Sequence, residues 1–490
     1  MLDRRSFISH SAVISAAMAA LRGTPLYAED PKPAKRSSLG DTLRVAVIGT
    51  GGRGGSHLGA FNGNHGCDIV TVCDADKSRA GAASKGVGKK SGHDPVVVQD
   101  MRKIFDDKSI DIVTFATPNH WHALGAIWAM QAGKHVYVEK PCSHNVREGR
   151  LMIDAARKHK RICQVGTQSR SMPGLRESIA YIHEGKLGKV KLAYATCYKR
   201  RGSIGKVDGP QPVPAGVDYD LWCGPAQKLP ILREKFHYDW HWFWEYGNGD
   251  LGNQGVHEMD KARWGLKKNE LPKSVVSAGG RFGYIDDGET ANTQLCVFEY
   301  SDAELVFEVR GLASDSPYPG NLGGKRGGNF VGNIWYGENG VLVCPSYNSG
   351  VVLAPDMSVV KKFSGGGDQL HFENFVNAVR SGKHEDLNCD VSEGHPSAAL
   401  CHLANISLRL GKKVELGDLK EIAGTKEAND ALKKMVTHLE DNKVDLKSPA
   451  MLGAVLPIDP TKEKFVGNND KANAMLSREY RKGFEPDERA

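Results

Sequence analysis

A hydrophobic strand that breaks into a glycine-rich turn is the feature that most constrains the fold of this chain. The run from Arg44 to Gly55 reads RVAVIGTGGRGG and places Gly49, Gly51 and Gly54 in the spacing G-x-G-x-x-G. Such a turn, leading from a strand into a helix, offers backbone N–H groups and the positive end of the helix dipole to a pyrophosphate. The sequence therefore predicts a dinucleotide-binding unit in which these glycines and Arg53 contact the cofactor.

An acidic residue at the end of the next strand supports this prediction. The strand from Asp68 ends at Asp74, twenty residues beyond Gly54. A carboxylate there binds the ribose hydroxyls and repels a 2′-phosphate, which favours NAD over NADP as the cofactor. The basic residues Lys77 and Arg79 follow closely and could bind the 2′-phosphate of NADP, so NADP stays open as the less favoured cofactor.

The distribution of apolar residues divides the chain into two domains and an arm. From residue 41 to 168, short apolar runs alternate with helical segments, which predicts a doubly wound parallel α/β sheet. From 169 to 425, alternating strands and two amphipathic helices predict a second α/β domain with a mainly antiparallel sheet. Residues 426–490 are polar with scattered apolar residues, as in an arm that wraps its own domain or a neighbouring subunit. The expected helices cover 123–133, 146–160, 369–381 and 397–410, and the later strands 189–198, 274–282, 292–310 and 329–360.

The N-terminus resembles an export signal. Arg4 and Arg5 precede a modest stretch rich in alanine and serine over residues 12–21. This pattern predicts a twin-arginine signal over residues 1–28 and a linker over residues 29–40, with an ordinary frayed terminus as the alternative.

Export through this route would place the folded protein in the periplasm or outside the cytoplasm. The apolar stretch is too short and weakly hydrophobic for a stable membrane span. Leu26 stands where a small residue is preferred before cleavage, so an uncleaved, tethered form stays open. Because free NAD is scarce outside the cytoplasm, we expect the cofactor to be tightly bound.

Composition argues against several classes of protein. The net charge is only +7 over 490 residues and the basic residues are scattered, which argues against nucleic-acid binding. The ten cysteines form no C-x-x-C pair and show no zinc-ligand spacing. We therefore expect no metal site and no disulfide framework, although a single disulfide stays open.

Three further motifs, together with the glycine turn, indicate a family. They read TPNHWH over 117–122, EKP over 139–141 and GDLGNQGVHEMD over 249–260. With these motifs the chain resembles the Gfo/Idh/MocA oxidoreductases across nearly all of its mature length. The resemblance implies a Rossmann domain and a C-terminal α/β domain whose open sheet often mediates oligomers, here a homodimer or homotetramer. It also implies an NAD(P)-dependent oxidoreductase that acts on CH–OH groups.

Lys140 and His257 are the candidate catalytic residues. Lys140 follows Glu139 at the carboxyl edge of the sheet, where burial and a nearby oxidised nicotinamide would lower its pKa. The alternative is a solvated surface lysine, but the resemblance makes this lysine catalytic. His257 and Asn253 are four apart and would share a helix face, with Asp260 as a cap or buttress. The family commonly has an aspartate in place of Asn253, so the proton acceptor stays open between Lys140 and His257.

Other polar residues lie at the same predicted edge of the sheet. Thr117 and Asn119 end a strand and would border the nicotinamide ribose. By resemblance, Asn119 and His122 belong to the cofactor or substrate environment, as Glu139 does. Gln168 and Arg170 are substrate candidates, with ordinary surface hydrogen bonding as the alternative.

An aromatic-rich run precedes the histidine motif. Residues 236–246 read FHYDWHWFWEY, and Trp240 is the chosen substrate candidate among them. Aromatic faces with interleaved histidine and aspartate suit stacking on a sugar ring. A packed interdomain core is an equal alternative, and Trp222 would belong to the same wall.

Three functions are consistent with these residues. The first is an exported oxidoreductase that passes a hydride from a sugar or glycoside hydroxyl carbon to tightly bound NAD. The second is a redox-neutral glycoside hydrolase or lyase, which acts through a transient keto-sugar. The third is a dinucleotide-binding scaffold without catalysis, against which intact Lys140 and His257 argue.

Overall fold

The computed structural model describes residues 42–320 and 322–487, which belong to one compact unit that begins at Thr42. The export signal expected over residues 1–28 and the linker over 29–40 lie outside the described residues. Among the residues that are described, no helix is both long and apolar enough to span a bilayer.

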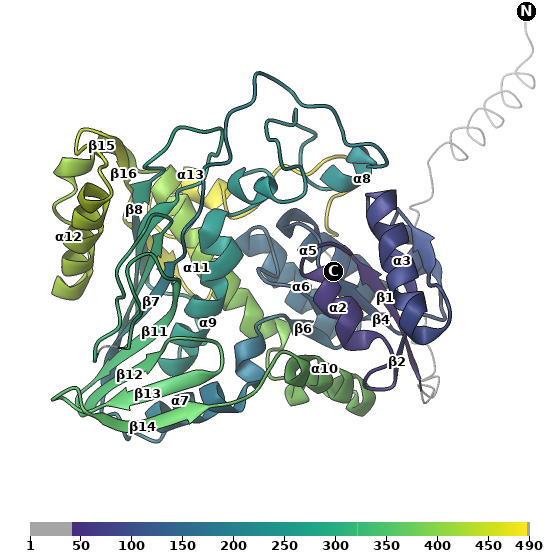
Figure 1. Ribbon diagram of the computed structural model, residues 1–490, viewed down its shortest axis with the longest axis horizontal. Coiled ribbons are helices and arrows are strands. Elements are labelled where there is room, and N and C mark those ends of the chain that lie inside the picture. Colours follow the sequence, from purple (N-terminus) through teal and green to yellow (C-terminus); the bar gives the residue numbers. More distant parts are fainter. Residues whose placement is uncertain (1–41, 321, 488–490) are drawn as a thin grey trace, which may run out of the picture. The chain divides into compact units, whose positions relative to one another are not determined.

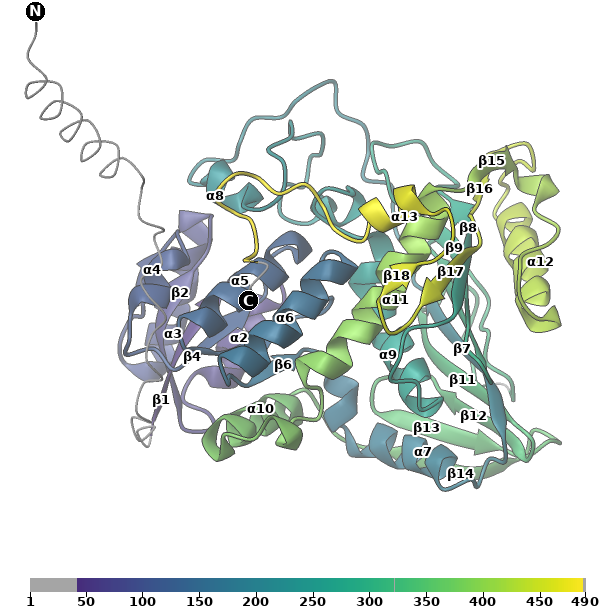
Figure 2. The same cartoon turned by 180° about the vertical axis from the view of Figure 1, so that it is seen from behind.

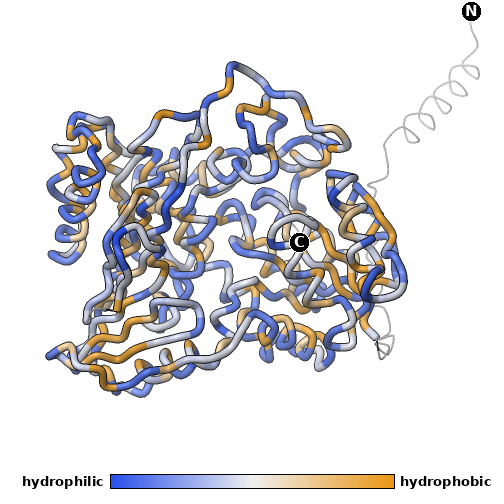
Figure 3. Tube along the Cα trace, in the orientation of Figure 1, coloured by the Kyte–Doolittle hydropathy of each residue, from blue (hydrophilic) through white to orange (hydrophobic). Residues whose placement is uncertain are grey.

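The first domain is built on a six-stranded sheet in the order β3-β2-β1-β4-β5-β6. All neighbouring strands are parallel, which confirms the predicted doubly wound sheet. The strands are β1 (Leu43–Ile48), β2 (Cys67–Cys73), β3 (Val96–Val98), β4 (Ile112–Phe115), β5 (His135–Val138) and β6 (Cys163–Val165). The helices between them are α2 (Gly54–Phe61), α3 (Lys77–Ser91), α4 (Arg102–Asp106), α5 (Asn119–Gln131) and α6 (Val146–Lys158). Continuous apolar runs form the inner strands because helices cover both faces, and orange segments accordingly follow these strands in Figure 3.

The second domain contains a twelve-stranded sheet, which lies to the left of α9 and α11 in Figure 1. The main strand order is β14-β13-β12-β11-β7-β10-β9-β8-β16-β15, and β17 and β18 extend it beside β8. Only β7 and β10 pair in parallel among these described neighbours, so the mainly antiparallel sheet is also confirmed. The strands are β7 (Val190–Tyr198), β8 (Ser274–Gly280), β9 (Thr293–Glu299), β10 (Glu304–Arg310), β11 (Phe330–Gly337), β12 (Gly340–Cys344), β13 (Ser349–Leu353), β14 (Val359–Ser364), β15 (Lys412–Glu415), β16 (Pro449–Leu452), β17 (Leu456–Asp459) and β18 (Lys464–Phe465).

Helices cover both faces of this sheet. Phe298 and Phe307 pack with α9 and α11, whereas Leu295 and Val297 pack with α12. The alternation follows from the two-residue period of a strand. The helices of this half are α7 (Pro173–His183), α8 (Tyr219–Cys223), α9 (Val256–Gly265), α10 (Gln369–Ser381), α11 (Val391–Arg409), α12 (Lys426–Asp441) and α13 (Asp470–Ala474).

One helix from the second half of the chain completes the first domain. α10 lies against the parallel sheet (Figure 1), where Phe372 and Phe375 pack with Leu43 and Tyr137. Segment 369–381 is thus a helix with the expected bounds, but its apolar face belongs to the core of the Rossmann domain.

Several element boundaries differ from the expected ones. α5 begins at Asn119 rather than 123, because its first turn is buried and shows no amphipathic pattern. α11 begins at Val391 rather than 397, because Asp390 caps it through Ser392 N, and the helix continues through Pro396. The expected strand 292–310 is a hairpin of β9 and β10, and 329–360 divides among β11 to β14.

The arm over residues 426–490 contains regular elements. α12 presents a buried apolar face to the sheet, and β16 and β17 pair with β8. After α13 the chain runs past α8 to α5 (Figure 2, yellow). The arm therefore wraps its own subunit.

Candidate functional site

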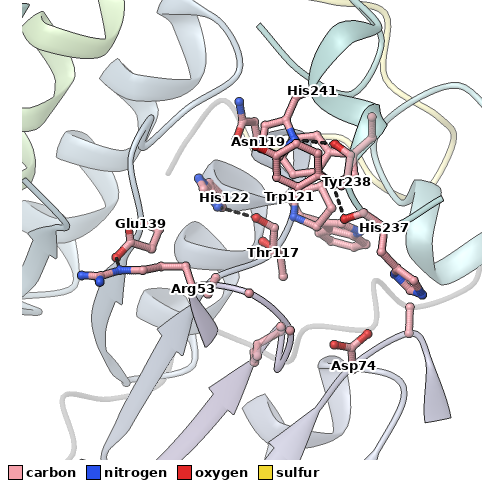
Figure 4. Close-up of a pocket in the computed structure, with 18 of the residues that line it drawn as sticks. Arg53, Asp74, Thr117, Asn119, Trp121, His122, Glu139, His237, Tyr238 and His241 are labelled. Atoms are coloured by element: carbon pink, nitrogen blue, oxygen red, sulfur yellow. Dashed lines mark hydrogen bonds and ion pairs between the residues drawn. The ribbon is translucent and has the colours of Figure 1, made fainter. Parts of the chain in front are cut away.

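A cavity of about 450 Å³ opens at the carboxyl edge of the parallel sheet (Figure 4). It is lined by the glycine turn, the ends of β2, β4 and β5, and the segment before α9. Most of the predicted site residues line it together: Gly49, Gly51, Arg53, Asp74, Thr117, Asn119, His122, Glu139, Lys140, Gln168, Trp240, Asn253 and His257. Gly54 and Arg170 are not among the lining residues.

The glycine turn combines close packing with open space. Gly49 has φ of +81°, and a Cβ there would lie 2.6 Å from the carbonyl of Ala116. A Cβ on Gly54 would collide with the backbone oxygen of Gly49, so Gly54 acts through packing. Above Gly52 there is open space, and no side chain caps the first amides of α2. Gly54 N and Gly55 N donate to Gly51 O and Gly52 O, at 2.9 and 3.1 Å. The positive end of the helix dipole at this open turn would attract a pyrophosphate, so the turn fits a dinucleotide.

Asp74 is held rigidly where β2 ends. Its Oδ2 accepts hydrogen bonds from Thr50 N at 2.9 Å and Thr50 Oγ1 at 3.0 Å. Its Oδ1 accepts from Asp76 N at 3.0 Å. Arg79 lies over Gly51 and pairs with Asp76 at 3.8 Å. Asp74 lines the cavity, and its Oδ1 has accepting capacity left for a ribose hydroxyl.

The buried Glu139 and the half-buried Arg53 form an ionic cluster on one wall (Figure 4). Arg53 Nε donates to Glu139 Oε1 at 2.9 Å, and Arg53 Nη1 donates to Asp368 at 2.6 Å. Gln168 Nε2 also donates to Glu139 at 3.3 Å. Burial alone would raise the pKa of Glu139, but the hydrogen bond from His57 and the charge of Arg53 hold it well below its usual range. The ionised Glu139 thus orients Arg53 and places a negative charge beside Lys140.

Lys140 follows β5 and reaches the segment that precedes α9. Its Nζ donates a hydrogen bond to the backbone oxygen of Asn253. Burial lowers the pKa of Lys140, Glu139 partly offsets that effect, and Arg53 lowers it further. A buried amine with a lowered pKa is suited to accept a proton.

His257 lies in the first turn of α9, with its ring 4.9 Å from the ring of Tyr347. Its Nδ1 is buried and has no hydrogen-bond partner in the described part of the chain. Burial, and then the charge of Lys140, lower the pKa of His257 well below its ordinary value. The imidazole is therefore neutral at physiological pH.

Asn253 lies in a π-helical turn rather than in the expected α-helix, but it still lines the same cavity as His257. Leu251–Gly255 forms a π-helical turn, in which the rotation per residue differs from that of an α-helix. The side chain of Asn253 accordingly donates to Asp250 at 3.4 Å, and its backbone oxygen binds Lys140.

Arg170 and Asp260 lie away from the cavity. Arg170 Nε donates to both carboxylate oxygens of Asp260, at 2.8 and 3.0 Å, and both residues are buried. Ser397 Oγ adds a hydrogen bond of 2.7 Å to Asp260, and Glu393 pairs with Arg170 at 3.0 Å. The pair joins α9 to α11 and the segment after β6, which is a structural role.

His122 connects two loops at the cavity floor. Its Nδ1 lies 2.6 Å from the backbone oxygen of Pro141, and its Nε2 lies 2.8 Å from that of Thr117. Burial lowers the pKa of His122, and the neutral ring can donate to only one of these oxygens at a time. The ring lies between the segments that follow β4 and β5.

The aromatic run of residues 236–246 both forms a hydrophobic core cluster and contributes to the cavity wall. Phe236, Trp242, Phe243 and Tyr246 pack with Trp222 as a separate core cluster. Trp240 belongs to this cluster as well, and like Trp222 it also lines the cavity; its ring stacks on that of His241 at 3.7 Å.

Sequence reasoning missed several lining residues. His241 Nδ1 lies 2.5 Å from the backbone oxygen of Tyr238, which fixes Nδ1 as the donor, and burial lowers the pKa of His241 to about 3. In the sequence, only the position of His241 within the aromatic run of residues 236–246 could have marked it as a cavity residue. Tyr347, in the turn between β12 and β13, and Phe484, in the C-terminal tail, belong to no recognisable motif.

The cysteines and acidic residues form no further site in the described part of the chain. All ten cysteines are free and buried, so no disulfide framework exists. The described residues contain no group of three or more histidine, cysteine, aspartate or glutamate side chains that could hold a metal ion.

Solved structures share this fold. Levoglucosan dehydrogenase in complex with NADH and levoglucosan matches with a TM-score of 0.56 at 19% identity, covering 74% of this chain and 96% of that one. The WlbA dehydrogenase from Bordetella pertussis, in complex with NADH and UDP-GlcNAcA, matches with a TM-score of 0.54 at 20% identity, covering 75% and 97%.

Curated relatives match over a shorter segment. Glycosyl hydrolase family 109 protein 2 of Shewanella sp. (strain ANA-3) is 32% identical over 176 residues, which are 33% of this chain and 39% of the relative. A glycosyl hydrolase family 109 protein of Saccharopolyspora erythraea is 30% identical over 202 residues, which are 38% and 44%. The chain thus spans well under half the length of these relatives.

Two family models together cover most of the described chain. Residues 43–167 match the oxidoreductase family with an NAD-binding Rossmann fold, and residues 182–442 match the C-terminal alpha/beta domain of the same family. The second match alone covers more than half of the 490 residues. The chain therefore belongs to the Gfo/Idh/MocA oxidoreductase family.

Proposed function

We propose that this protein oxidises a hydroxyl group of a sugar or glycoside, with tightly bound NAD as the hydride acceptor. The observation that carries the proposal is the convergence of Lys140, His257 and His241 on the cavity that begins at the glycine turn and Asp74. Asp74 favours NAD over NADP. When bound, NAD supplies the electrophilic carbon that takes the hydride.

Lys140 is the better proton acceptor of the two candidates. Its backbone partner, Asn253 O, fixes the position of Nζ, and burial lowers its pKa. His257 has a pKa so far below its ordinary value that it binds protons weakly. A neutral imidazole can still hydrogen-bond the substrate hydroxyl and orient it toward Lys140.

A redox-neutral glycoside cleavage is the second candidate function. The curated relatives, which match 176 and 202 residues, carry the name glycosyl hydrolase family 109. His241 lies in the same cavity as Lys140, and because its Nδ1 donates to Tyr238 O, its Nε2 can accept a hydrogen bond from the substrate. In this function a base in the cavity would accept the proton from the carbon next to the transient carbonyl. The glycosidic oxygen then leaves, water adds, and the hydride returns.

The two functions differ in their products. We would incubate the purified protein, with its bound nucleotide, with a panel of sugars and aryl glycosides in D₂O. Keto-sugar and reduced nucleotide in equal amounts would support net oxidation. Released aglycone without net reduction, with deuterium at the adjacent carbon, would support cleavage. A protein that binds NAD but yields neither product across the panel would contradict both.

The proposed proton acceptor also sets the dependence of the rate on pH. Lys140 accepts a proton only as the neutral amine, so kcat should fall as the pH falls through its folded-state pKa. Burial places that pKa below the ordinary value of 10.5, so the acid limb should lie below this value. A profile of kcat between about pH 6 and 10 measures it. A limb centred on the ordinary lysine value would contradict the proposal.

We infer that the protein is exported folded through the twin-arginine route and acts in the periplasm. Arg4 and Arg5 before the weakly apolar stretch support this inference. A variant with Arg4→Lys and Arg5→Lys should accumulate in the cytoplasmic fraction, whereas the parent chain should leave it. Equal distribution of the two proteins on cell fractionation would count against export.

We also infer a homodimer or homotetramer that forms through the large sheet. Apolar side chains of its β11 and β14 are exposed, among them Tyr336, Val359 and Val360. Light scattering during size-exclusion chromatography should give two or four chains per particle. A monomer at micromolar concentration would overturn this inference.

A further inference from the structure

The C-terminal tail, residues 475–487, leaves the second domain and is attached to α6 of the Rossmann domain. Arg147 N donates to Leu476 O at 2.9 Å. The hydroxyl of Tyr480 donates to Glu148 Oε1 at 3.1 Å, and Glu148 is itself buried. These contacts give the tail a defined path across the surface of this domain.

The tail is also attached to the long loop segment 199–250, which we call the roof segment. Arg481 Nη2 donates to Asp220 Oδ1 at 2.7 Å. Arg478 pairs with Glu245. The side chain of Gln227 donates to the backbone oxygen of Glu479 at 3.3 Å. The tail and the roof segment therefore form one connected layer.

The roof segment in turn contacts the Rossmann domain beside Asp74. His237 Nε2 lies 3.0 Å from Asp76 Oδ2. Asp218 N donates to Ala75 O at 2.9 Å, and Lys77 N donates to Gly216 O at 3.1 Å. The layer is thus attached to the Rossmann domain at two places, at residues 75–77 directly after Asp74 and at α6.

The tail places one aromatic ring in the cavity wall. Phe484 is 7% exposed, and its ring lies 5.7 Å from that of Trp121 and 6.2 Å from that of Trp128. The guanidinium of Arg102 lies 5.9 Å from the Phe484 ring centre. Phe484, Trp121, Arg102 and Met101 line the same cavity as Asp74.

We propose that the C-terminal tail forms the adenine end of the nucleotide site and prevents the dinucleotide from leaving. The inference rests on the proposed NAD site. A pyrophosphate at the glycine turn and a ribose at Asp74 require the adenine to extend beyond Asp74. There Phe484 and Trp121 offer aromatic walls for the base. Release then requires the tail to separate from the roof segment first.

Two variants test this role without measuring catalysis. Phe484→Ala removes the ring, whereas Arg481→Ala keeps the ring but removes the hydrogen bonds to Asp220 and the guanidinium that lies 5.0 Å from the Phe484 ring centre. Phe465→Ala is the matched control, because it deletes the same side chain from β18, in the core of the second domain and outside the cavity lining. Bound NADH is followed by its fluorescence as excess NAD displaces it, and retained nucleotide per chain is measured after desalting.

Loss of one stacking partner for a base should raise the dissociation rate on the order of tenfold. We expect this increase in both tail variants and a parental rate in Phe465→Ala. If the parent holds a dinucleotide and both tail variants release it at the parental rate, the tail is no part of the site. A parent that holds no dinucleotide would overturn the proposed function as well.

Discussion

Lys140→Met should lower kcat by about 10²- to 10⁴-fold, the usual contribution of a positioned acid–base group. Methionine retains most of the length and apolar volume of lysine but cannot accept a proton. The affinity for NAD should stay near that of the parent, because the pyrophosphate and ribose contacts lie at the glycine turn and Asp74. Single-turnover hydride transfer and equilibrium NAD binding separate the two quantities.

Lys134→Met is the matched control for this experiment. Lys134 is also a buried lysine, since it is 2% exposed and donates to Ile110 O at 2.9 Å. It lies just before β5, at the opposite end of the strand from Lys140. Its replacement should leave kcat unchanged. Parental turnover in Lys140→Met would refute the assignment and leave His257 as the acceptor.

Arg170→Met should lower the free energy of unfolding by about 3–5 kcal/mol, the cost of leaving one member of a buried ion pair without its partner. The side chain of Asp260 is fully buried, so it cannot recover the lost hydrogen bonds from water. Arg263, 3.9 Å away, and Ser397 are its remaining partners. Urea denaturation followed by tryptophan fluorescence measures the loss.

The double variant Arg170→Met, Asp260→Leu provides the comparison. It replaces both charges with apolar groups, so it should be more stable than Arg170→Met alone. The KM for the sugar should stay near the parental value in any variant that folds, because Arg170 is not among the cavity-lining residues. A raised KM for the sugar together with an unchanged free energy of unfolding would indicate that Arg170 contacts the substrate.

The local motifs predicted the edge of the sheet at which the site lies. A strand followed by a glycine turn, an acid at the next strand end and EKP after β5 each specify a short segment that folds in a standard way. The doubly wound sheet then brings the carboxyl ends of these strands together. For that reason Gly51, Asp74 and Lys140 line one cavity.

Residues whose position depends on irregular backbone were not predictable in this way. The backbone oxygen of Asn253 that binds Lys140 lies in the π-helical turn Leu251–Gly255, and no sequence period signals this turn. Arg170 lies just after a strand end, as Gln168 does, but its partner Asp260 is ninety residues away in sequence. Phe484 reaches the cavity only because the tail follows a long path without secondary structure.

The position of α10 has a consequence for how the chain matures during synthesis. Phe372 and Phe375 cover one face of a sheet whose first strand begins at Leu43, more than three hundred residues earlier. A nascent chain that has emerged only as far as the end of the sixth strand therefore exposes an apolar sheet face. Such a chain would be a substrate for chaperones until α10 is synthesised. The Rossmann half should accordingly be insoluble when expressed by itself, and it should become soluble when α10 is present in the same polypeptide.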